Sequence, residues 1–266
     1  MDQNAIAYVQ SRLEGRKPTA GIILGSGLGN LGDRISDPVI IRYTDIPGFP
    51  PATAIGHKGN FICGQLGGQC VIAMQGRYHI YEGYSLEEVT MPFRLMAALG
   101  ISELITSNAS GALNPSYELG DLMVLNGHIN MLDGDICNGK KFGEEYYDAE
   151  IRERLLEVAV VEGVALRRGC YVAVTGPSYE TPAEHFYFIN SGGDAIGMST
   201  VPDIELAASM SIKVLAVSIV ADAPHYCTDP LTGVMLREND PTDGEEVVRI
   251  AEEAAERLGD LIEKII

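Results

Sequence analysis

Six short apolar runs, each followed at once by small, charged or imidazole residues, constrain the fold of this 266-residue chain more than any other feature. The runs span residues 20–24, 70–75, 103–106, 171–175, 194–197 and 213–220. They are too short for typical helices and lack an alternating polar face, which predicts strands buried on both sides. Because ligands of open α/β sheets bind outside the carboxyl ends of strands, the polar clusters predict one small-molecule site.

The segments between these runs carry helical patterns. Ser85 to Leu99 begins with a serine cap and a glutamate three residues later, and it ends before Gly100. Further helices are predicted over residues 148–161, 182–190, 203–211 and 244–265. No linker divides the chain, so we expect one α/β domain over residues 1–266. The breaker-rich segments 47–59 and 223–244 are expected to be loops, either of which would serve as a lid.

The charge balance and the cysteines narrow the class of partner. The chain has 37 acidic and 19 basic residues, a formal charge of −18, which disfavours nucleic acid and anionic membranes. Five widely spaced cysteines without a C-x-x-C pair suggest neither a disulfide framework nor a zinc site. No leader-like segment and no membrane-spanning run is recognised. We therefore expect a cytoplasmic protein without a metal.

The segment Gly27–Gly32 matches G-x-G-x-x-G after a strand, which would indicate a dinucleotide-dependent oxidoreductase. Only six residues separate it from the next apolar run, whereas a parallel crossover needs roughly a dozen or more. We reject the dinucleotide interpretation on that ground. A phosphate-binding turn with Ser26 as hydroxyl donor and a plain glycine turn both remain open.

Two residues at one strand end suit an anion. Arg77 and His79 are one residue apart, so in extended geometry both point to one side and Tyr78 to the other. An arginine fork beside an imidazole fits phosphate or carboxylate, although a solvated arginine beside a structural histidine is the alternative.

Small and acidic residues follow the other runs. Residues 108–111 and 198–200 are interpreted as small-residue turns whose N–H and hydroxyl groups would complete an anion cradle. Glu180 and Asp222 are carboxylates at strand ends that would bind the N–H edge of a heterocycle, unless they serve as caps or in salt bridges. His57 is expected at the surface unless its loop folds over the ligand. Three other histidines, His128, His185 and His225, are interpreted as structural.

Five of these motifs, in order and across nearly the whole chain, resemble the trimeric purine nucleoside phosphorylases. They are Gly25-Ser26-Gly27-Leu28-Gly29, residues 76–84 (GRYHIYEGY), Ser107-Asn108-Ala109-Ser110-Gly111, residues 176–181 (GPSYET) and residues 197–202 (GMSTVP). The resemblance implies a phosphorylase/hydrolase-like fold with a central mixed β-sheet flanked by helices, and a homotrimer. It implies cleavage of purine nucleosides by inorganic phosphate, a co-substrate, with no cofactor.

The resemblance also implies residue roles. Phosphate would be held by Ser26, His57, Arg77, His79, the backbone of Ala109 and Ser199. Tyr81 and Met198 would contact the ribose, Tyr179 would stack on the base, and Glu180 would accept from its N1 edge. Asp222 would offset charge at N7 of the leaving purine. The expected catalytic residues are thus Asp222, His79 and Glu180.

Two departures from the family pattern bear on the substrate. Asp222 stands where the 6-oxopurine enzymes usually have asparagine, which leaves 6-aminopurines open. Gly244 stands near the position of a histidine that usually meets the ribose 5′-hydroxyl, so His225 or another loop residue is the candidate substitute. The segment 138–147 is shortened where a neighbouring subunit's phenylalanine normally covers the ribose, and Phe142 is the candidate there. The alternatives are therefore a methylthioadenosine phosphorylase and a nucleoside-binding protein without turnover.

Overall fold

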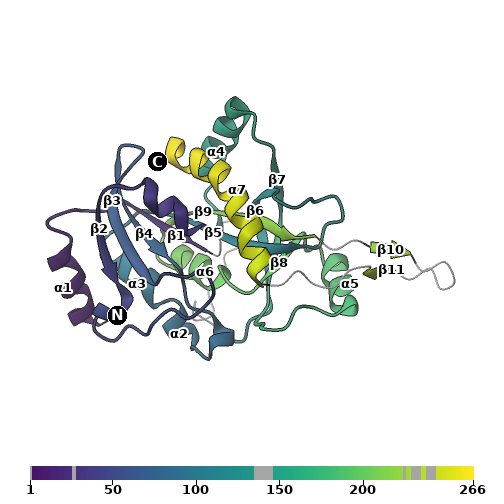
Figure 1. Ribbon diagram of the computed structural model, residues 1–266, viewed down its shortest axis with the longest axis horizontal. Helices are drawn as coiled ribbons and strands as arrows, with labels where there is room; N and C mark the ends of the chain where they lie inside the picture. The colour runs from purple at the N-terminus through teal and green to yellow at the C-terminus, as the bar shows by residue number, and fades with distance from the viewer. Residues whose placement is uncertain (1, 26–27, 135–145, 224–225, 229–234, 238–243) are drawn as a thin grey trace.

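The structure is a computed structural model that describes residues 2–25, 28–134, 146–223, 226–228, 235–237 and 244–266. Among these residues nine strands form one mixed sheet with helices on both sides (Figure 1). The strands are β1 Ala20–Leu24, β2 Ser36–Arg42, β3 Asn60–Leu66, β4 Gln69–Gln75, β5 Glu103–Ala112, β6 Leu122–Asn130, β7 Leu166–Ala173, β8 Ala195–Gly197 and β9 Lys213–Asp222. The expected fold class, a central mixed β-sheet flanked by helices, is confirmed.

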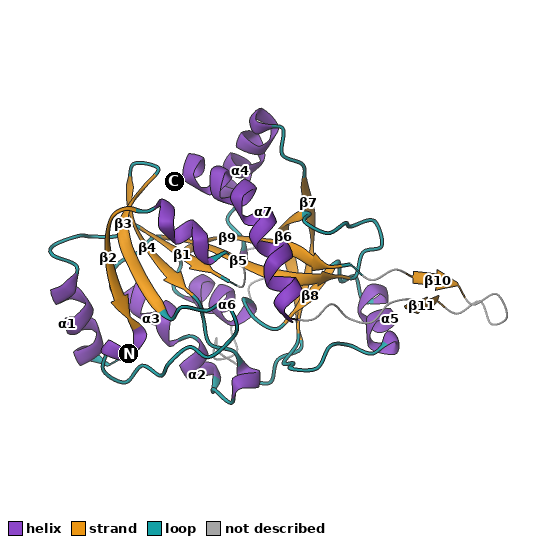
Figure 2. Cartoon of the chain, viewed as in Figure 1, coloured by secondary structure: helices purple, strands orange, loops and turns teal. Residues whose placement is uncertain are grey.

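Helices connect and cover these strands (Figure 2). They are α1 Gln3–Arg12, α2 Leu86–Val89, α3 Met91–Ala98, α4 Ala149–Glu162, α5 Pro182–Asn190, α6 Val201–Ser209 and α7 Gly244–Ile265, with short 3₁₀ helices η1 Gly29–Arg34, η2 Tyr43–Asp45 and η3 Ile80–Glu82. A separate antiparallel pair, β10 Tyr226–Thr228 and β11 Met235–Arg237, lies away from the main sheet.

The sheet closes on itself at one end. Its order is β2-β3-β4-β1-β5-β8-β7-β6-β9, and β9 also pairs with β5. The strands β4, β1, β5 and β9 run parallel, whereas β8 is antiparallel to β5 and β6 is antiparallel to β9. Five strands, β5, β8, β7, β6 and β9, thus form a closed ring, and its opening gathers strand ends that lie far apart in the sequence.

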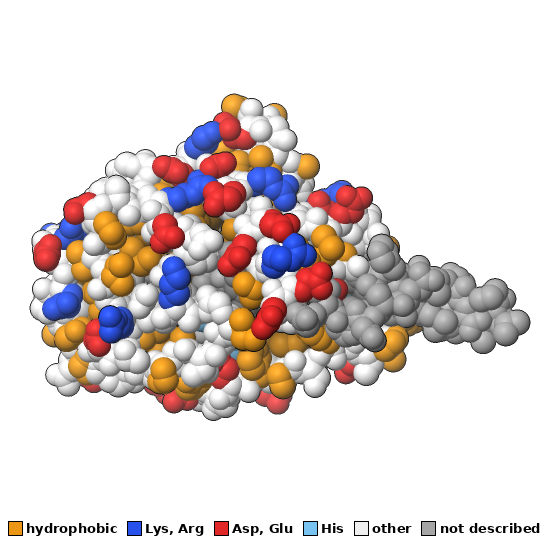
Figure 3. Space-filling view, in the orientation of Figure 1, with side chains coloured by type: hydrophobic (Ala, Val, Ile, Leu, Met, Phe, Trp, Pro, Cys, Tyr) orange, Lys and Arg blue, Asp and Glu red, His pale blue; other side chains and the backbone are white. Residues whose placement is uncertain are grey.

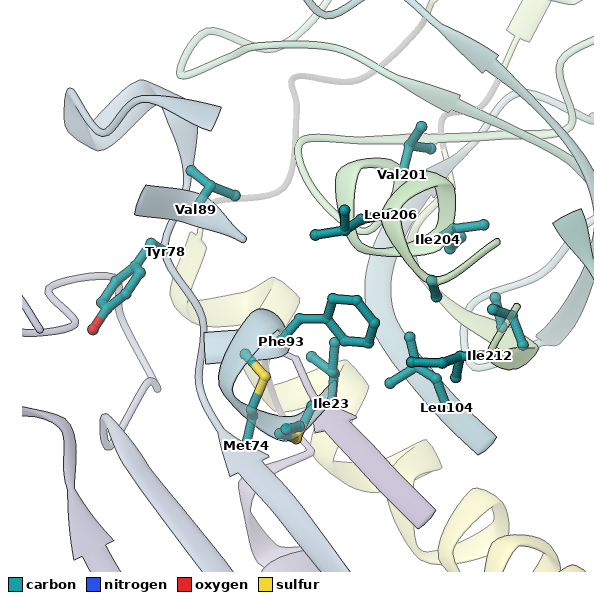
Figure 4. Packing of buried hydrophobic residues seen from close by; sticks show 14 of the residues in the cluster. Ile23, Met74, Tyr78, Val89, Phe93, Leu104, Val201, Ile204, Leu206 and Ile212 are labelled. Carbon is teal, nitrogen blue, oxygen red and sulfur yellow. The ribbon is translucent and has the colours of Figure 1, made fainter. Parts of the chain in front are cut away.

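Helices bury both faces of the parallel part of the sheet. Ile23 faces a cluster with residues of α1, α3 and α6, part of which Figure 4 shows. Its neighbours Ile22 and Leu24 face the opposite cluster, which includes α4 and α7. This double burial explains why the runs are apolar throughout.

Helix α7 is amphipathic along all its 22 residues. Leu258, Leu261 and Ile262 are fully buried against the sheet. Figure 3 shows acidic and basic side chains on this face of the molecule. Glu256 of α7 pairs with Arg34 of η1. The C-terminal helix was predicted with these same bounds, and so was α5.

One predicted helix was wrong in its continuity. Ser85 caps α2 as expected, with reciprocal bonds to Glu88, but the helix breaks at Thr90 and restarts as α3. Pro92 explains the break, since a proline ring clashes with the carbonyl group four residues earlier and cannot donate an N–H. Proline fits the first turn of a new helix instead.

The interpretation of residues 108–111 as a turn was also wrong. These residues continue β5, paired in parallel with β9 as far as Asp222. Small polar residues stay in the strand because Ser218 of β9 lies 2.6 Å from both the Oδ1 atom of Asn108 and the Oγ atom of Ser110. Buried polar groups are tolerated when they are hydrogen-bonded in this way.

The glycine-rich segment behaves as its spacing predicted. From Leu28 on, β1 is followed by the short η1 and then by β2, which pairs antiparallel with β3. No helical crossover to a parallel strand follows β1, as the rejection of a dinucleotide site required. Ser26 and Gly27 lie outside the described residues. None of the helices in the described ranges is long and apolar enough to cross a membrane.

Candidate active site

A cavity of about 390 Å³ opens where the six predicted clusters meet. That volume is in the range of small-molecule sites. Its wall includes Gly25 after β1, Arg77 and His79 after β4, Asn108–Gly111 in β5, Tyr179 and Glu180 after β7, Ile196–Ser199 at β8, and Asp222 at the end of β9. The predicted convergence of strand ends is therefore confirmed.

Arg77 lines this cavity and is 2% exposed. Its Nη1 atom donates to the hydroxyl of Thr200 at 2.8 Å, and its Nη2 atom donates to the carbonyl of Ser107 at 2.5 Å. Gly25 makes room for this packing, because a Cβ there would lie 2.6 Å from the Ser107 carbonyl oxygen. The guanidinium group is thus fixed in orientation by one strand, β5, and by the residue that precedes α6.

Asp203 of α6 faces the same guanidinium group. Its Oδ2 atom is 4.0 Å from Nη1 of Arg77, and both side chains are almost wholly buried. Burial raises the pKa of the Asp203 carboxyl to about 6, against the opposing attraction of Arg77. Burial also lowers the pKa of Arg77, and the Asp203 charge opposes that shift. The site therefore contains a desolvated charge pair behind its anion-facing wall.

Thr200 holds this network at a strained position. It has φ +73°, which a β-branched residue rarely adopts, and it precedes the first residue of α6. Its hydroxyl also lies 2.9 Å from the amide nitrogen of Asn108 and 3.0 Å from the hydroxyl of Ser199. The start of α6, whose N-terminal dipole favours anions, is thereby held beside Arg77.

Three aromatic rings stack along one side of the cavity. The His57 and His79 ring centroids are 5.1 Å apart, and those of His79 and Tyr81 are 4.7 Å apart. The Nδ1 atom of His57 lies 2.9 Å from the carbonyl oxygen of Arg77. His57 is only partly buried and is not among the cavity-lining residues, although its loop contributes Thr53, Ala54 and Ile55 to the wall.

Both histidines of the stack are held neutral near pH 7. Burial lowers the pKa of His57 to about 4, and it lowers the pKa of His79 as well. His79 is oriented by Glu82, whose Oε2 atom is 3.0 Å from Nδ1. Burial alone would raise the pKa of Glu82, but hydrogen bonds from His79 and Thr53 bring it down to about 2. The stack thus offers imidazole hydrogen bonds next to the Arg77 charge.

The side-chain directions expected around Arg77 are confirmed. Arg77 and His79 both line the cavity. Tyr78 points into the core, where its ring centroid lies 5.6 Å from that of Tyr43 in an edge-on contact. The buried aromatic packing of Tyr78 anchors the strand end from behind.

The cavity wall also carries acidic and aromatic side chains. Tyr179 is 40% exposed, while Asp222 is 6% exposed. Glu180 lies next to a residue that the sequence analysis did not assign to the site, His185 of α5, with 3.6 Å between His185 Nε2 and Glu180 Oε2. His185 lines the cavity and is 2% exposed.

A sequence signal for His185 exists in the helix start. Thr181 and Glu184 form a capping box that begins α5. The residue before such a cap and the fourth helical residue characteristically meet, usually as an apolar pair. Here those two positions are Glu180 and His185, so the capping box itself predicts their contact.

A third wall of the cavity is apolar. It is formed by Gly244, Val247 and Val248 at the start of α7, together with Ile55 from the 47–59 loop. A Cβ on Gly56 would lie 3.6 Å from Val248, so this loop and α7 are in contact. His225 and Phe142, considered from the sequence for this region, lie outside the described residues.

The remaining predicted site residues either line the cavity or lie outside the described residues. Ala109, Met198 and Ser199 line the cavity with those above. Ser26 lies outside the described residues. Within the described ranges, no group of three or more His, Cys, Asp or Glu side chains is arranged to hold a metal ion.

Comparison with known proteins agrees with this geometry. Residues 19–266 match the family model of the phosphorylase superfamily. The chain is 44% identical to purine nucleoside phosphorylase 1 of Geobacillus stearothermophilus, over 87% of this chain and 89% of that protein. It is 39% identical to purine nucleoside phosphorylase 1 of Bacillus subtilis (strain 168), over 99% and 97% of the two chains.

Solved structures give the same result. The Schistosoma mansoni purine nucleoside phosphorylase in complex with adenosine superposes with a TM-score of 0.84 at 37% identity, over 98% of this chain and 94% of that one. The complex of the Schistosoma mansoni enzyme with inosine gives a TM-score of 0.85 at 35% identity, over 98% and 93%.

Proposed function

Because this chain belongs to the phosphorylase superfamily and is a purine nucleoside phosphorylase, a pentosyltransferase, we propose that its cavity binds inorganic phosphate and a purine nucleoside together. The reaction cleaves the N-glycosidic bond and yields free base and ribose 1-phosphate. The observation that carries the proposal is the lining of the cavity, which combines the Arg77 guanidinium group with the carboxyl groups of Glu180 and Asp222.

Phosphate is assigned to the Arg77 end. The dianion's charge is met by Arg77 and the N-terminal dipole of α6, and hydrogen bonds come from His79, Ser199 and the backbone of Ala109. A neutral His79 gives its one N–H to Glu82, so it donates to the phosphate through Nε2 when the dianion brings a proton to the ring. His57 joins if its loop moves inward, and Ser26 is assigned from the sequence alone.

The nucleoside is assigned to the remaining length of the cavity. Tyr81 and Met198 flank the ribose, and Tyr179 stacks on the base, for which its exposure leaves it available. Glu180 accepts from the N1 edge, and Asp222 faces N7. The two carboxylates give the base end the hydrogen-bonding groups that a purine edge requires.

The physical reason for catalysis is that the two ends act on one bond. Cleavage proceeds towards a ribosyl cation, which a phosphate held beside the anomeric carbon stabilises. The electron pair of the broken bond goes to the purine, and Asp222 in its protonated form donates to N7 and offsets the charge there. Holding phosphate and sugar in contact supplies several kcal/mol more as proximity.

One observation favours a second substrate class, the 5′-methylthio nucleosides. Gly244, Val247, Val248 and Ile55 form an apolar wall where a polar contact to a 5′-hydroxyl would otherwise be expected. Such a wall fits a methylthio group, because apolar surface binds apolar substituents. Methylthioadenosine therefore belongs among the substrates to be tested.

The assembly and setting are proposed by resemblance. A homotrimer is supported by Phe186 and Tyr187 of α5, which are 58% and 57% exposed in the single chain. The reaction is proposed to need no cofactor or metal beyond the co-substrate. A reducing, cytoplasmic setting is supported by the free thiols of Cys63, Cys70 and Cys170. Light scattering and activity after chelation test the first two proposals.

The decisive experiment follows release of free base from inosine, guanosine, adenosine and methylthioadenosine at neutral pH, each with and without phosphate. Phosphate-dependent release with formation of ribose 1-phosphate is expected for at least one nucleoside. Release that ignores phosphate would indicate hydrolysis, and no release from any nucleoside would leave a binding protein.

A further inference from the structure

His185 is a buried titratable group at the base end of the cavity that the reaction described above does not use. Its side chain is 2% exposed, and its Nε2 atom is 3.6 Å from Oε2 of Glu180, whose side chain is 9% exposed. This separation exceeds a direct hydrogen bond but lies within electrostatic reach. Contacts of this kind often tighten only when the ligand is bound.

The position of His185 is fixed by its helix. The reciprocal bonds of the capping box, Thr181 to Glu184 at 2.8 Å and back at 3.3 Å, define where α5 begins. The backbone N–H of His185 donates to the Thr181 carbonyl at 3.0 Å. Glu180 directly precedes the cap, so the two side chains are held together by local structure.

The two classes of purine place opposite demands on Glu180. A 6-oxopurine carries N1–H, a donor, and an ionised carboxylate accepts from it. A 6-aminopurine presents N1 as an acceptor, so the same carboxyl group must be protonated to donate. Asp222, in turn, offers an acceptor that a 6-amino group satisfies.

A carboxyl group alone is seldom protonated near neutral pH, so it rarely donates to N1 of a 6-aminopurine. An ordinary glutamic acid side chain is protonated in about one molecule in 500 at pH 7, whereas an ordinary histidine is protonated in about one in four. A histidine beside the carboxyl group is therefore a local proton source.

We infer that His185 is a positioning residue that shares one proton with Glu180, which allows this enzyme to cleave both 6-oxopurine and 6-aminopurine nucleosides. With a 6-oxopurine the pair is imidazolium and carboxylate, and Glu180 accepts from N1–H. With a 6-aminopurine one proton passes from His185 to Glu180, which donates to N1, while the neutral imidazole keeps its other proton. The pair carries the same number of protons in both complexes. This inference rests on the proposed function.

Other titratable groups surround the pair. The Glu184 carboxyl interacts electrostatically with His185, and the Tyr171 hydroxyl interacts with Glu180. Tyr179 and Asp222 line the same end of the cavity. Glu184 is exposed and serves the helix cap. Glu180 lines the cavity, and its Oε2 atom lies 3.6 Å from the Nε2 atom of His185.

The test compares kcat/KM for adenosine and inosine at saturating phosphate in His185→Gln, whose amide occupies the place of Nε2 without exchanging a proton. At pH 7 adenosine should lose at least about 10-fold and inosine less than about 3-fold. The adenosine loss should shrink at pH 5.5, where solvent protonates Glu180 more often. Equal losses for both nucleosides, or an unchanged ratio, would overturn the inference.

Two further variants separate proton sharing from packing. Glu180→Gln presents a permanent amide donor, so in this background His185→Gln should no longer change the adenosine-to-inosine ratio; a full effect in the double variant argues against proton sharing. His128→Gln is the matched control, because His128 Nε2 lies 3.5 Å from Glu205 in a similar buried pair outside the cavity wall. The ratio should stay at the wild-type value.

A measurement on the wild-type enzyme keeps the inference testable if His185→Gln does not fold. Calorimetric titration with adenine and with hypoxanthine, in buffers of different ionisation enthalpy, counts protons taken up. Adenine should take up no more than hypoxanthine, and an additional uptake near one proton would contradict the inference. Absence of any phosphate-dependent cleavage by wild type would instead defeat the proposed function, and cleavage of inosine without adenosine would defeat only the inference.

Discussion

The carboxylate of Asp203 lies 4.0 Å from the guanidinium group of Arg77, on the side away from the cavity, and both are buried. Among the described residues, neither the Oδ1 atom of Asp203 nor the Nε atom of Arg77 has a hydrogen-bond partner. Two such desolvated groups are costly for folding, because burial of charge is incompletely repaid by attraction. The arrangement is understandable if a bound anion completes the charge balance around Arg77.

Asp203→Asn tests this idea through stability. Burial raises the pKa of Asp203 to about 6, so its ionised carboxylate costs stability at pH 7, and its replacement leaves the Arg77 guanidinium without a buried counter-ion. Phosphate should therefore stabilise the variant more than it stabilises wild type, because the dianion takes over as counter-ion. Urea denaturation with and without 50 mM phosphate measures this difference. If phosphate stabilises the variant and wild type equally, Asp203 and phosphate do not share Arg77.

Arg77→Ala should abolish phosphate-dependent turnover, with a loss of about 10³-fold or more in kcat/KM for phosphate, since a fixed charged donor is removed from a desolvated site. Steady-state kinetics with varied phosphate measures this loss. Arg16→Ala is the control, because Arg16 pairs only with the exposed Glu14 and Asp37 in the ion pairs described. Retained turnover in a folded Arg77→Ala enzyme would remove Arg77 from the phosphate site.

His57 should make the protein less stable as the pH falls. Its pKa in the folded protein, about 4, is below the ordinary value of 6.5, so the unfolded chain binds more protons between these values. The stabilisation is present above pH 6.5 and is lost as the pH falls, by roughly 2 kcal/mol between pH 7 and pH 5. Asp203 acts in the opposite direction, because its pKa is raised to about 6.

The contribution of His57 is isolated by comparing His57→Asn with wild type. The asparagine amide occupies the place of Nδ1 and can keep the contact with the Arg77 backbone. Chemical denaturation at pH 7 and pH 5 should show a smaller drop for the variant. Parallel pH dependences would mean that the His57 ring does not carry the shift.

Local periodicity predicted much of the site. The alternation of a strand places Arg77 and His79 on one side and Tyr78 on the other, because side chains alternate whatever the surroundings. The apolar runs predicted the strands, since burial on both faces leaves no polar period. The bounds of α5 were also predictable from its cap, and those of α7 from its amphipathic period.

Tertiary contacts decided what the sequence could not. Asn108 and Ser110 have the composition of a turn, but pairing with β9 and the hydroxyl of Ser218, more than a hundred residues away, keep them in a strand. The Thr200 and Asp203 network depends on α6 meeting β4 and β5, which no local pattern encodes. His185 was not predicted for a different reason, because the fourth helical residue after such a cap is usually apolar and here it is a histidine.

Asp222→Asn should shift the base preference towards 6-oxopurines. A protonated Asp222 that donates to N7 keeps only an acceptor for the six-position, which suits a 6-amino group but repels O6 of hypoxanthine, whereas the two N–H groups of an asparagine amide donate to both N7 and O6. A site with the matching hydrogen-bond group discriminates strongly against the mismatched base. The ratio of kcat/KM for inosine to that for adenosine should therefore rise at least about 10-fold, measured by base release under saturating phosphate. Glu205→Gln, outside the cavity wall, is the control. An unchanged ratio in Asp222→Asn would show that Asp222 does not contact the six-position of the base, and the preference would then have to come from Glu180 and its histidine.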